Sequence, residues 1–122
     1  MKDSSAVLAL KNRHQRLQKE LAQVGLIALG TISRRMIVKP DPADKTKKKT
    51  YGPYYQWTYK QQGKTVTVNL TSNQAREFQA AIDNQRKLEL IVKKMHELSK
   101  MILQSTTEGV LKRMRTPSMQ KP

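Results

Sequence analysis

Residues 54–70 alternate between large apolar and polar side chains, and this alternation constrains the fold more than any other part of the sequence. It predicts a β-hairpin with strands at 54–61 and 64–70 and a turn at Gln62 and Gly63. Side chains directly opposite each other share a face, and successive side chains point to opposite faces. One face, the aromatic face, then pairs Tyr55 with Leu70, Trp57 with Val68, and Tyr59 with Val66. The other, the polar face, pairs Gln56 with Asn69, Thr58 with Thr67, and Lys60 with Thr65.

The aromatic residues are concentrated in this region, since five of the six in the chain lie between positions 51 and 59. We expect Tyr55, Trp57 and Tyr59 to form the buried side of a small sheet, because large rings supply apolar area that short strands otherwise lack. Tyr51 and Tyr54 lie outside that set, beside a Gly-Pro turn. They are candidates for stacking on bases or contacting phosphate, and packing across the neighbouring loop is the alternative.

A first strand is expected over residues 31–38, where β-branched residues are frequent. It completes a three-stranded antiparallel sheet. Residues 39–50 follow, with two prolines, two aspartates and five lysines. This composition disfavours regular structure and predicts a mobile basic loop whose lysines are solvated.

Two helices are predicted to flank the sheet. Apolar residues at heptad spacing indicate a helix over residues 5–25, with a serine at its N-terminal cap and Gly25 at its C-terminal cap. Thr71 and Gln74 form a capping box that begins a long helix over residues 72–104. Because its distal half requires a second apolar surface, we expect the two helices to pair as a helical hairpin or coiled coil. The sequence thus predicts a single α+β domain over residues 1–104, then a basic, partly disordered tail at 105–122.

The composition offers little for catalysis. The chain has no cysteine, which excludes disulfides, thiolate metal sites and a thiol nucleophile. Asp41 and Asp44 have no nearby histidine or third acid to complete a two-metal site, and the glycines at 52 and 63 are turn residues, not a phosphate-binding loop. We therefore predict no enzymatic activity, no cofactor and no metal. No apolar run reaches the ~18 residues of a membrane-spanning helix, which favours a soluble cytoplasmic protein.

The charge points to an anionic partner. Lysine and arginine number 24 against 9 acidic residues, a formal charge of +15, and residues 28–70 hold nine basic residues against two acidic ones. Lysines beside the polar face are able to meet phosphates while its amides and hydroxyls meet base edges, and a two-stranded ribbon fits the major groove. An ordinary solvent-facing sheet carries similar residues, which is the alternative interpretation. The predicted nucleic-acid-binding residues are Arg34, Arg35, Lys45, Lys47, Lys48, Lys49, Tyr54, Gln56, Thr58, Lys60, Lys64, Thr67 and Asn69.

Several motifs also resemble a family of small bacterial proteins of unknown function that are found near transposase genes. These motifs are GTISRR at 30–35, GPYYQW at 52–57, Lys60, and GKTVTVNL at 63–70, and the resemblance covers about residues 26–100. Members of the family carry a cysteine cluster, and often a histidine, ahead of the Gly-Pro-Tyr. This chain has a lysine-rich loop and Tyr51 there instead, so a metal held by those cysteines is not available to it. The resemblance implies work on nucleic acid in a mobile element, with a transposase as a possible protein partner.

We therefore predict a non-enzymatic nucleic-acid-binding protein, an accessory or regulator of a mobile element, with DNA favoured over RNA as the partner. The alternative is a structural or adaptor protein that docks through its helical pair within a nucleoprotein complex. A membrane-surface role is disfavoured, because the helices carry too few aromatic residues for an interfacial apolar face.

Overall fold

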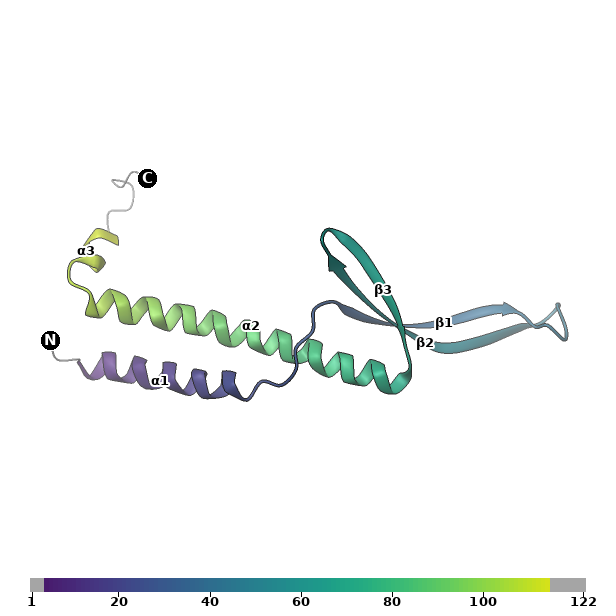
Figure 1. The fold of residues 1–122 in the computed structure, drawn as a ribbon, viewed down its shortest axis with the longest axis horizontal. Helices are drawn as coiled ribbons and strands as arrows, with labels where there is room; N and C mark the ends of the chain where they lie inside the picture. Colours follow the sequence, from purple (N-terminus) through teal and green to yellow (C-terminus); the bar gives the residue numbers. More distant parts are fainter. Residues whose placement is uncertain (1–3, 115–122) are drawn as a thin grey trace. The chain divides into compact units, whose positions relative to one another are not determined.

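A computed structural model describes residues 4–114 and shows the predicted α+β fold (Figure 1). The elements are α1 (Ser5–Ala22), β1 (Thr31–Pro40), β2 (Lys48–Gln61), β3 (Lys64–Leu70), α2 (Ser72–Thr106) and α3 (Val110–Met114). The strands form one antiparallel sheet in the order β1-β2-β3. The chain divides into two compact units, one formed by Gly25–Arg86 and the other by α1 with the part of the chain from Lys87 onward. The long helix α2 contributes residues to both units.

The β2–β3 hairpin has the predicted register. All six pairs are confirmed, from Tyr55 opposite Leu70 to Lys60 opposite Thr65. The turn residues Gln62 and Gly63 have φ angles of 50° and 79°. Positive φ at both positions is what a two-residue turn needs to follow the right-handed twist of the strands.

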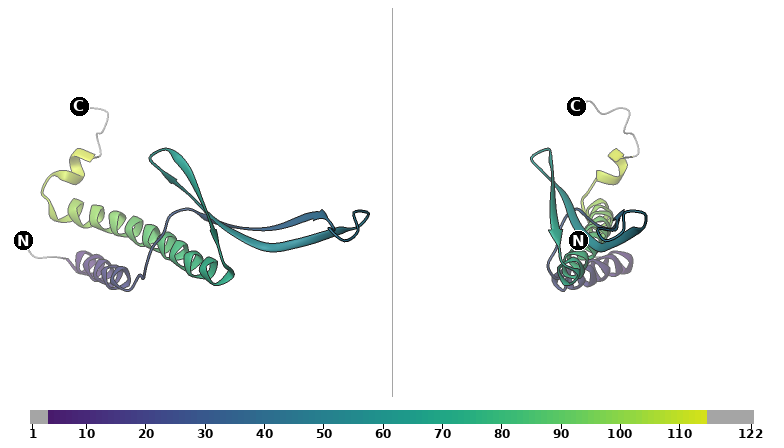
Figure 2. Two further views of the ribbon diagram at one scale, coloured as in Figure 1. Left: turned by 45° about the vertical axis from the view of Figure 1, so that its right-hand side comes forward. Right: turned by 90° about the vertical axis from the view of Figure 1, so that its right-hand side faces the viewer.

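The sheet extends into the segment that was predicted to be a basic loop. Residues 39–50 are not irregular throughout, because β1 runs to Pro40 and β2 begins at Lys48. Lys39 lies opposite Lys49, and Pro40 lies opposite Lys48. Exposed lysines do not prevent backbone pairing, and proline is tolerated at the end of an edge strand, where its missing N–H breaks no ladder. Figures 1 and 2 show the result, a two-stranded ribbon of β1 and β2 that continues past the end of β3.

Trp57 joins three parts of the Gly25–Arg86 unit. Its indole N–H donates a hydrogen bond of 2.8 Å to the carbonyl of Leu29, in the segment that leads into β1. Its ring stacks on Tyr59, with centroids 4.1 Å apart, and lies 4.8 Å from the ring of Phe78 on α2. The expectation that the aromatic face is buried was wrong in degree, since Tyr55, Trp57 and Tyr59 are half-buried. A single helix is too narrow to cover a sheet face, so the rings keep part of their contact with solvent.

Gly30 permits the close approach of the chain to Trp57. Its φ is +105°, which side chains rarely adopt. A Cβ atom at this position would clash with the carbonyl oxygen of Thr58 and would lie 2.8 Å from the indole nitrogen of Trp57. Glycine is therefore required here for both its conformation and its lack of a side chain.

The helix caps explain where α1 and α2 begin. The hydroxyl of Ser4 accepts from the backbone N–H of Val7, and Thr71 and Gln74 make both bonds of the predicted capping box. α1 ends earlier than predicted, at Ala22, with Gln23 as its C-cap instead of Gly25. α2 continues to Thr106, and α3 forms within the predicted tail. The prediction of disorder for residues 115–122 lies outside the described residues.

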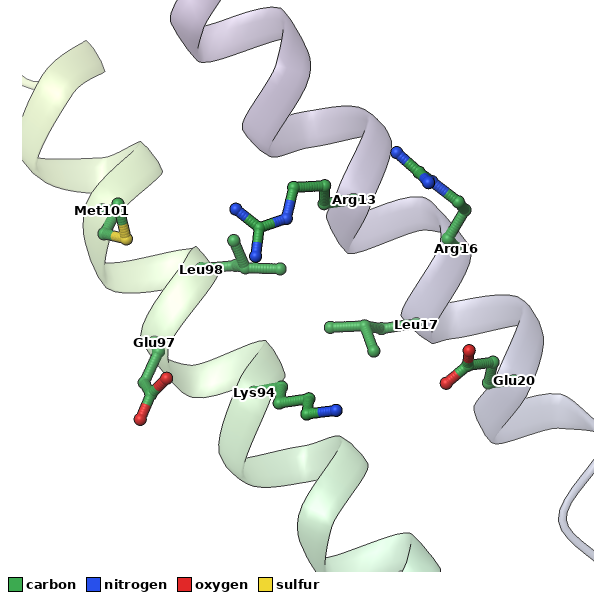
Figure 3. A pocket seen from close by; sticks show the side chains of 8 residues that line it. All are labelled: Arg13, Arg16, Leu17, Glu20, Lys94, Glu97, Leu98 and Met101. Carbon is green, nitrogen blue, oxygen red and sulfur yellow. The ribbon is translucent and has the colours of Figure 1, made fainter.

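The second unit rests on contact between α1 and α2. Val7 is 7% exposed, and Ile91 and Leu98 are 3% and 5% exposed, so these residues form its buried core. Leu17 of α1 and Leu98 of α2 point toward each other, with Arg13 and Lys94 beside them (Figure 3). Other apolar residues at heptad spacing on the two helices are half-buried: Leu10, Leu17 and Leu21 of α1, and Leu88 and Met95 of α2. The predicted pairing of the two helices is thus present.

The contacts of Trp57 predict its contribution to stability. We expect Trp57→Ala to lower the free energy of unfolding by about 2 to 3 kcal/mol, somewhat below the loss for a fully buried tryptophan, because the ring is only half-buried. Trp57→Phe retains a ring and loses the bond to Leu29, so its loss should be about 1 kcal/mol. Urea denaturation followed by circular dichroism measures both. Val38→Ala, at a side chain that is 58% exposed, is the matched control. If the Trp57→Ala protein were as stable as that control, the contacts of Trp57 would not contribute to stability as predicted.

Candidate nucleic-acid interface

The polar face of the hairpin is free of the aromatic contacts that hold the fold together. Gln56 donates a hydrogen bond of 3.1 Å to the side-chain oxygen of Asn69 across the two strands. The hydroxyls of Thr58 and Thr67 are 3.5 Å apart in the next cross-strand pair. These contacts order the polar side chains along the two strands.

Strand β1 extends this face. Ser33 lies opposite Gln56, and Arg35 lies opposite Tyr54. Because paired side chains point the same way, Arg35 and Tyr54 continue the polar face beyond the end of β3. Tyr54 is 46% exposed, whereas Tyr51 is half-buried.

A β-bulge keeps the next pairs on the same face. Between the pairs Arg35–Tyr54 and Ile37–Tyr51, β1 advances two residues and β2 advances three. Gly52 lies in the bulge with a φ of +121°, and a Cβ atom there would be 2.9 Å from the carbonyl oxygen of Arg35. Glycine therefore allows the two strands to remain close where β2 carries its extra residue.

The face continues to the tip of the ribbon. On β1, Arg35, Ile37 and Lys39 alternate to one side, and their partners on β2 are Tyr54, Tyr51 and Lys49. The ammonium group of Lys49 lies 5.5 Å from the centre of the Tyr51 ring, as expected for neighbours on one face. We call this continuous surface the polar strip; it consists of Thr58, Thr67, Gln56, Asn69, Arg35, Tyr54, Ile37, Tyr51, Lys39 and Lys49.

The polar strip contains a pocket at the point where β3 ends. It has a volume of about 320 Å³ and is lined by Arg35, Ile37, Tyr54, Tyr55, Gln56, Asn69 and Leu70. This volume lies near the lower end of the range for small-ligand pockets. Four of the predicted binding residues, from three strands, therefore surround one concavity.

The loop at the tip is organised by its two aspartates. Asp41 accepts a bond from the backbone of Ala43, and Asp44 accepts from the hydroxyl and the backbone N–H of Thr46. The Thr46 hydroxyl and then the Thr46 backbone N–H hold the pKa of Asp44 below its ordinary value. The loop is closed by a hydrogen bond of 2.9 Å from the backbone N–H of Asp41 to the carbonyl of Lys47. The two acids therefore hold the loop in shape, and Lys45, Lys47 and Lys48 are exposed around it.

Two predicted binding residues lie on the opposite face. Arg34 is opposite Tyr55, and Lys64 alternates with Val66, so both share the aromatic face. Lys60 is opposite Thr65 and stays with the polar face. The sequence did not place Lys39 and Ile37 in the predicted site, and it named Tyr51 only as a candidate for stacking or phosphate contact. Their place depends on the pairing of β1 with β2 beyond the bulge, which no local turn signal in the sequence fixes.

No family model, no characterised protein and no solved structure matches this chain. Within residues 4–114, no group of three or more histidine, aspartate or glutamate side chains is arranged to hold a metal ion. Over the same residues, no helix is long and apolar enough to cross a membrane.

The two opposed lysines at the tip of the ribbon should lower the stability of the strand pair. Like charges directly opposite each other weaken a strand pair, so we expect Lys39→Glu, which places a carboxylate opposite Lys49, to raise the free energy of unfolding by about 0.2 to 1 kcal/mol. The gain should disappear in 1 M salt, where charges are screened. Lys60→Glu makes the same change opposite Thr65 and is the control. Denaturation at two salt concentrations measures the difference, and equal stability of the two variants at low salt would contradict the prediction.

Proposed function

We propose that this protein binds nucleic acid through the polar strip and the lysines at the tip of the ribbon, and that it acts by binding without catalysing a reaction. The observation that carries the proposal is the continuity of the polar strip. One face presents hydroxyls and amides, then an arginine with a tyrosine, then lysines, in register along paired strands. The hydroxyls and amides suit contacts with base edges, the arginine and tyrosine suit stacking on bases, and the lysines suit contacts with phosphates.

The charge of the ribbon supports an anionic polymer as the partner. Lys39 and Lys49 are directly opposed, and Pro40–Lys48 is the adjacent pair, so positive charge is concentrated where it repels itself. Phosphates placed between these lysines relieve that repulsion and release counterions as they bind. The unfavourable charge arrangement in the free protein thus becomes a favourable one in the complex.

The finer proposal concerns the biological setting. The resemblance of the Gly-Pro-Tyr and Gly-Lys-Thr motifs to proteins found near transposase genes supports a role as an accessory or regulator of a mobile element. DNA is then the favoured nucleic acid, and a transposase is a candidate protein partner.

The second candidate function is that of an adaptor, and one observation favours it. The helices carry large apolar side chains that the fold leaves in solvent, including Leu90 at 53% and Leu103 at 61% exposure. Such side chains are available to a protein partner. If the parent protein binds no nucleic acid more tightly than a polylysine of equal charge does at physiological salt, the adaptor candidate replaces the first.

The salt dependence of binding tests the proposed function. Changing Lys47, Lys48 and Lys49 to Gln should weaken binding about equally on all sequences. It should also reduce the slope of log affinity against log salt by roughly two to three units, because each lost phosphate contact contributes about 0.7 to 0.9. The thermal melt should not fall, since all three side chains are exposed and the loss of Lys49 also removes its repulsion of Lys39.

A matched variant separates the interface from total charge. Changing Lys93, Lys94 and Lys100 of α2 to Gln removes the same three charges, also from exposed positions but in the other compact unit. This control should keep most of the salt slope. Equal losses in the two triple variants would show that net charge, and not the ribbon, causes the binding.

A further inference from the structure

The pocket at the end of β3 combines surfaces that suit a flat ring. Tyr54 offers an exposed aromatic face, and Arg35, its cross-strand partner, offers a planar guanidinium. Ile37, 38% exposed, adds an apolar surface one pair further along β1. Aromatic rings and arginine planes are the groups on which nucleobases stack.

The fourth side of the pocket is able to read the edge of such a ring. The bond from Gln56 to Asn69 uses one N–H and one oxygen lone pair. It leaves the carbonyl of Gln56 as an acceptor and the NH₂ of Asn69 as a donor. If the two amides are turned the other way, they again leave one donor and one acceptor. Every nucleobase carries a donor and an acceptor side by side on its Watson–Crick edge, in one order in A and C and in the opposite order in G and T. A given orientation of the amide pair therefore matches one of these two sets of bases and disfavours the other.

The geometry of the pocket distinguishes an unpaired base from a paired one. In a duplex the base faces are covered by their neighbours, and only the edges are open in the grooves. A concave site with a tyrosine and an arginine in its walls requires access to a base face, which only an unstacked base offers. The lysines at the tip continue from the pocket along the same strip, where they are able to follow the phosphates of the strand.

We propose that this pocket holds one unpaired nucleobase, so that the preferred partner is a single-stranded nucleic acid whose phosphates run toward Lys39 and Lys49. The inference rests on the proposed function, because it names the form of nucleic acid that the polar strip takes. Tyr54 supplies stacking for any base, while Gln56 and Asn69 discriminate between bases.

Fluorescence anisotropy with short labelled oligonucleotides tests the proposal. The full-length protein is titrated with a 12-nucleotide DNA strand, the RNA strand of the same sequence, the DNA duplex, and a DNA strand in which abasic sites replace every base. We expect at least one of the two single strands to bind about tenfold more tightly than the duplex. The abasic strand should lose about tenfold relative to the intact DNA strand, the contribution expected of one base–aromatic stack.

Variants of the pocket assign the effect to its residues. Tyr54→Ala should lose about tenfold on intact single strands and nothing on the abasic strand, while Tyr54→Phe retains the ring and the affinity. Asn69→Ala should reduce discrimination among abasic strands that each carry one A, C, G or T at the centre. Gln61→Ala, at an exposed position of β2 outside both the polar strip and the pocket lining, is the control.

Two results overturn the inference and are distinguishable. If duplex, single and abasic strands bind equally and Tyr54→Ala changes nothing, the pocket holds no base, although the lysine-dependent salt slope leaves the proposed function standing. If no oligonucleotide binds, the proposed function itself fails and the inference fails with it.

Discussion

The contacts of the Trp57 indole hold the sheet-containing unit together. The bond from its N–H to Leu29 fixes the chain as it enters β1, the stack on Tyr59 fixes the ring along β2, and the contact with Phe78 fixes β2 against α2. Because the ring is only half-buried, its directed contacts, the N–H hydrogen bond and the ring stacking, matter as much as its burial. Gly30 completes the arrangement, because any side chain at that position would collide with the backbone of β2. The entry to β1, strand β2 and the first part of α2 thus all contact one ring.

That arrangement assigns one face of β2 to the stability of the fold and leaves the other for the binding that we propose. The residues at 55, 57 and 59 are committed to the aromatic face, and those at 56 and 58 are left to the polar face. A strand can serve both purposes because its side chains alternate, so a change on one face has little direct effect on the other. The hydrogen bond between Gln56 and Asn69 orders these two side chains on the polar face. The entropic cost of ordering these side chains on binding is therefore partly met in the free protein.

The sequence was informative wherever two local signals agreed. The hairpin register could be predicted because the Gln62-Gly63 turn and the alternation of residues 54–70 point to the same pairs. The start of α2 could be predicted because Thr71 and Gln74 bond reciprocally. The pairing of β1 offered no such agreement, since no short turn joins it to β2. Because side chains alternate along β1, Arg34 lies on the aromatic face and Arg35 on the polar face. A count of charges in the sequence does not distinguish the two. The lysine-rich segment misled for a related reason, because composition reports on solvation and not on backbone pairing.

The bulge at Gly52 sets the phase of the ribbon relative to the hairpin. In a regular strand, Tyr54 would share its side with residues 52, 50 and 48, and the strip would end in Thr50 and Lys48. The extra residue advances the count by one, so that Tyr51 and Lys49 follow Tyr54 instead. A single inserted or deleted residue between positions 51 and 54 would exchange the two sides of the ribbon without changing its composition. The number of residues in β2 between positions 51 and 54, odd or even, therefore decides which side chains of the ribbon lie on the polar strip and which lie on the opposite side.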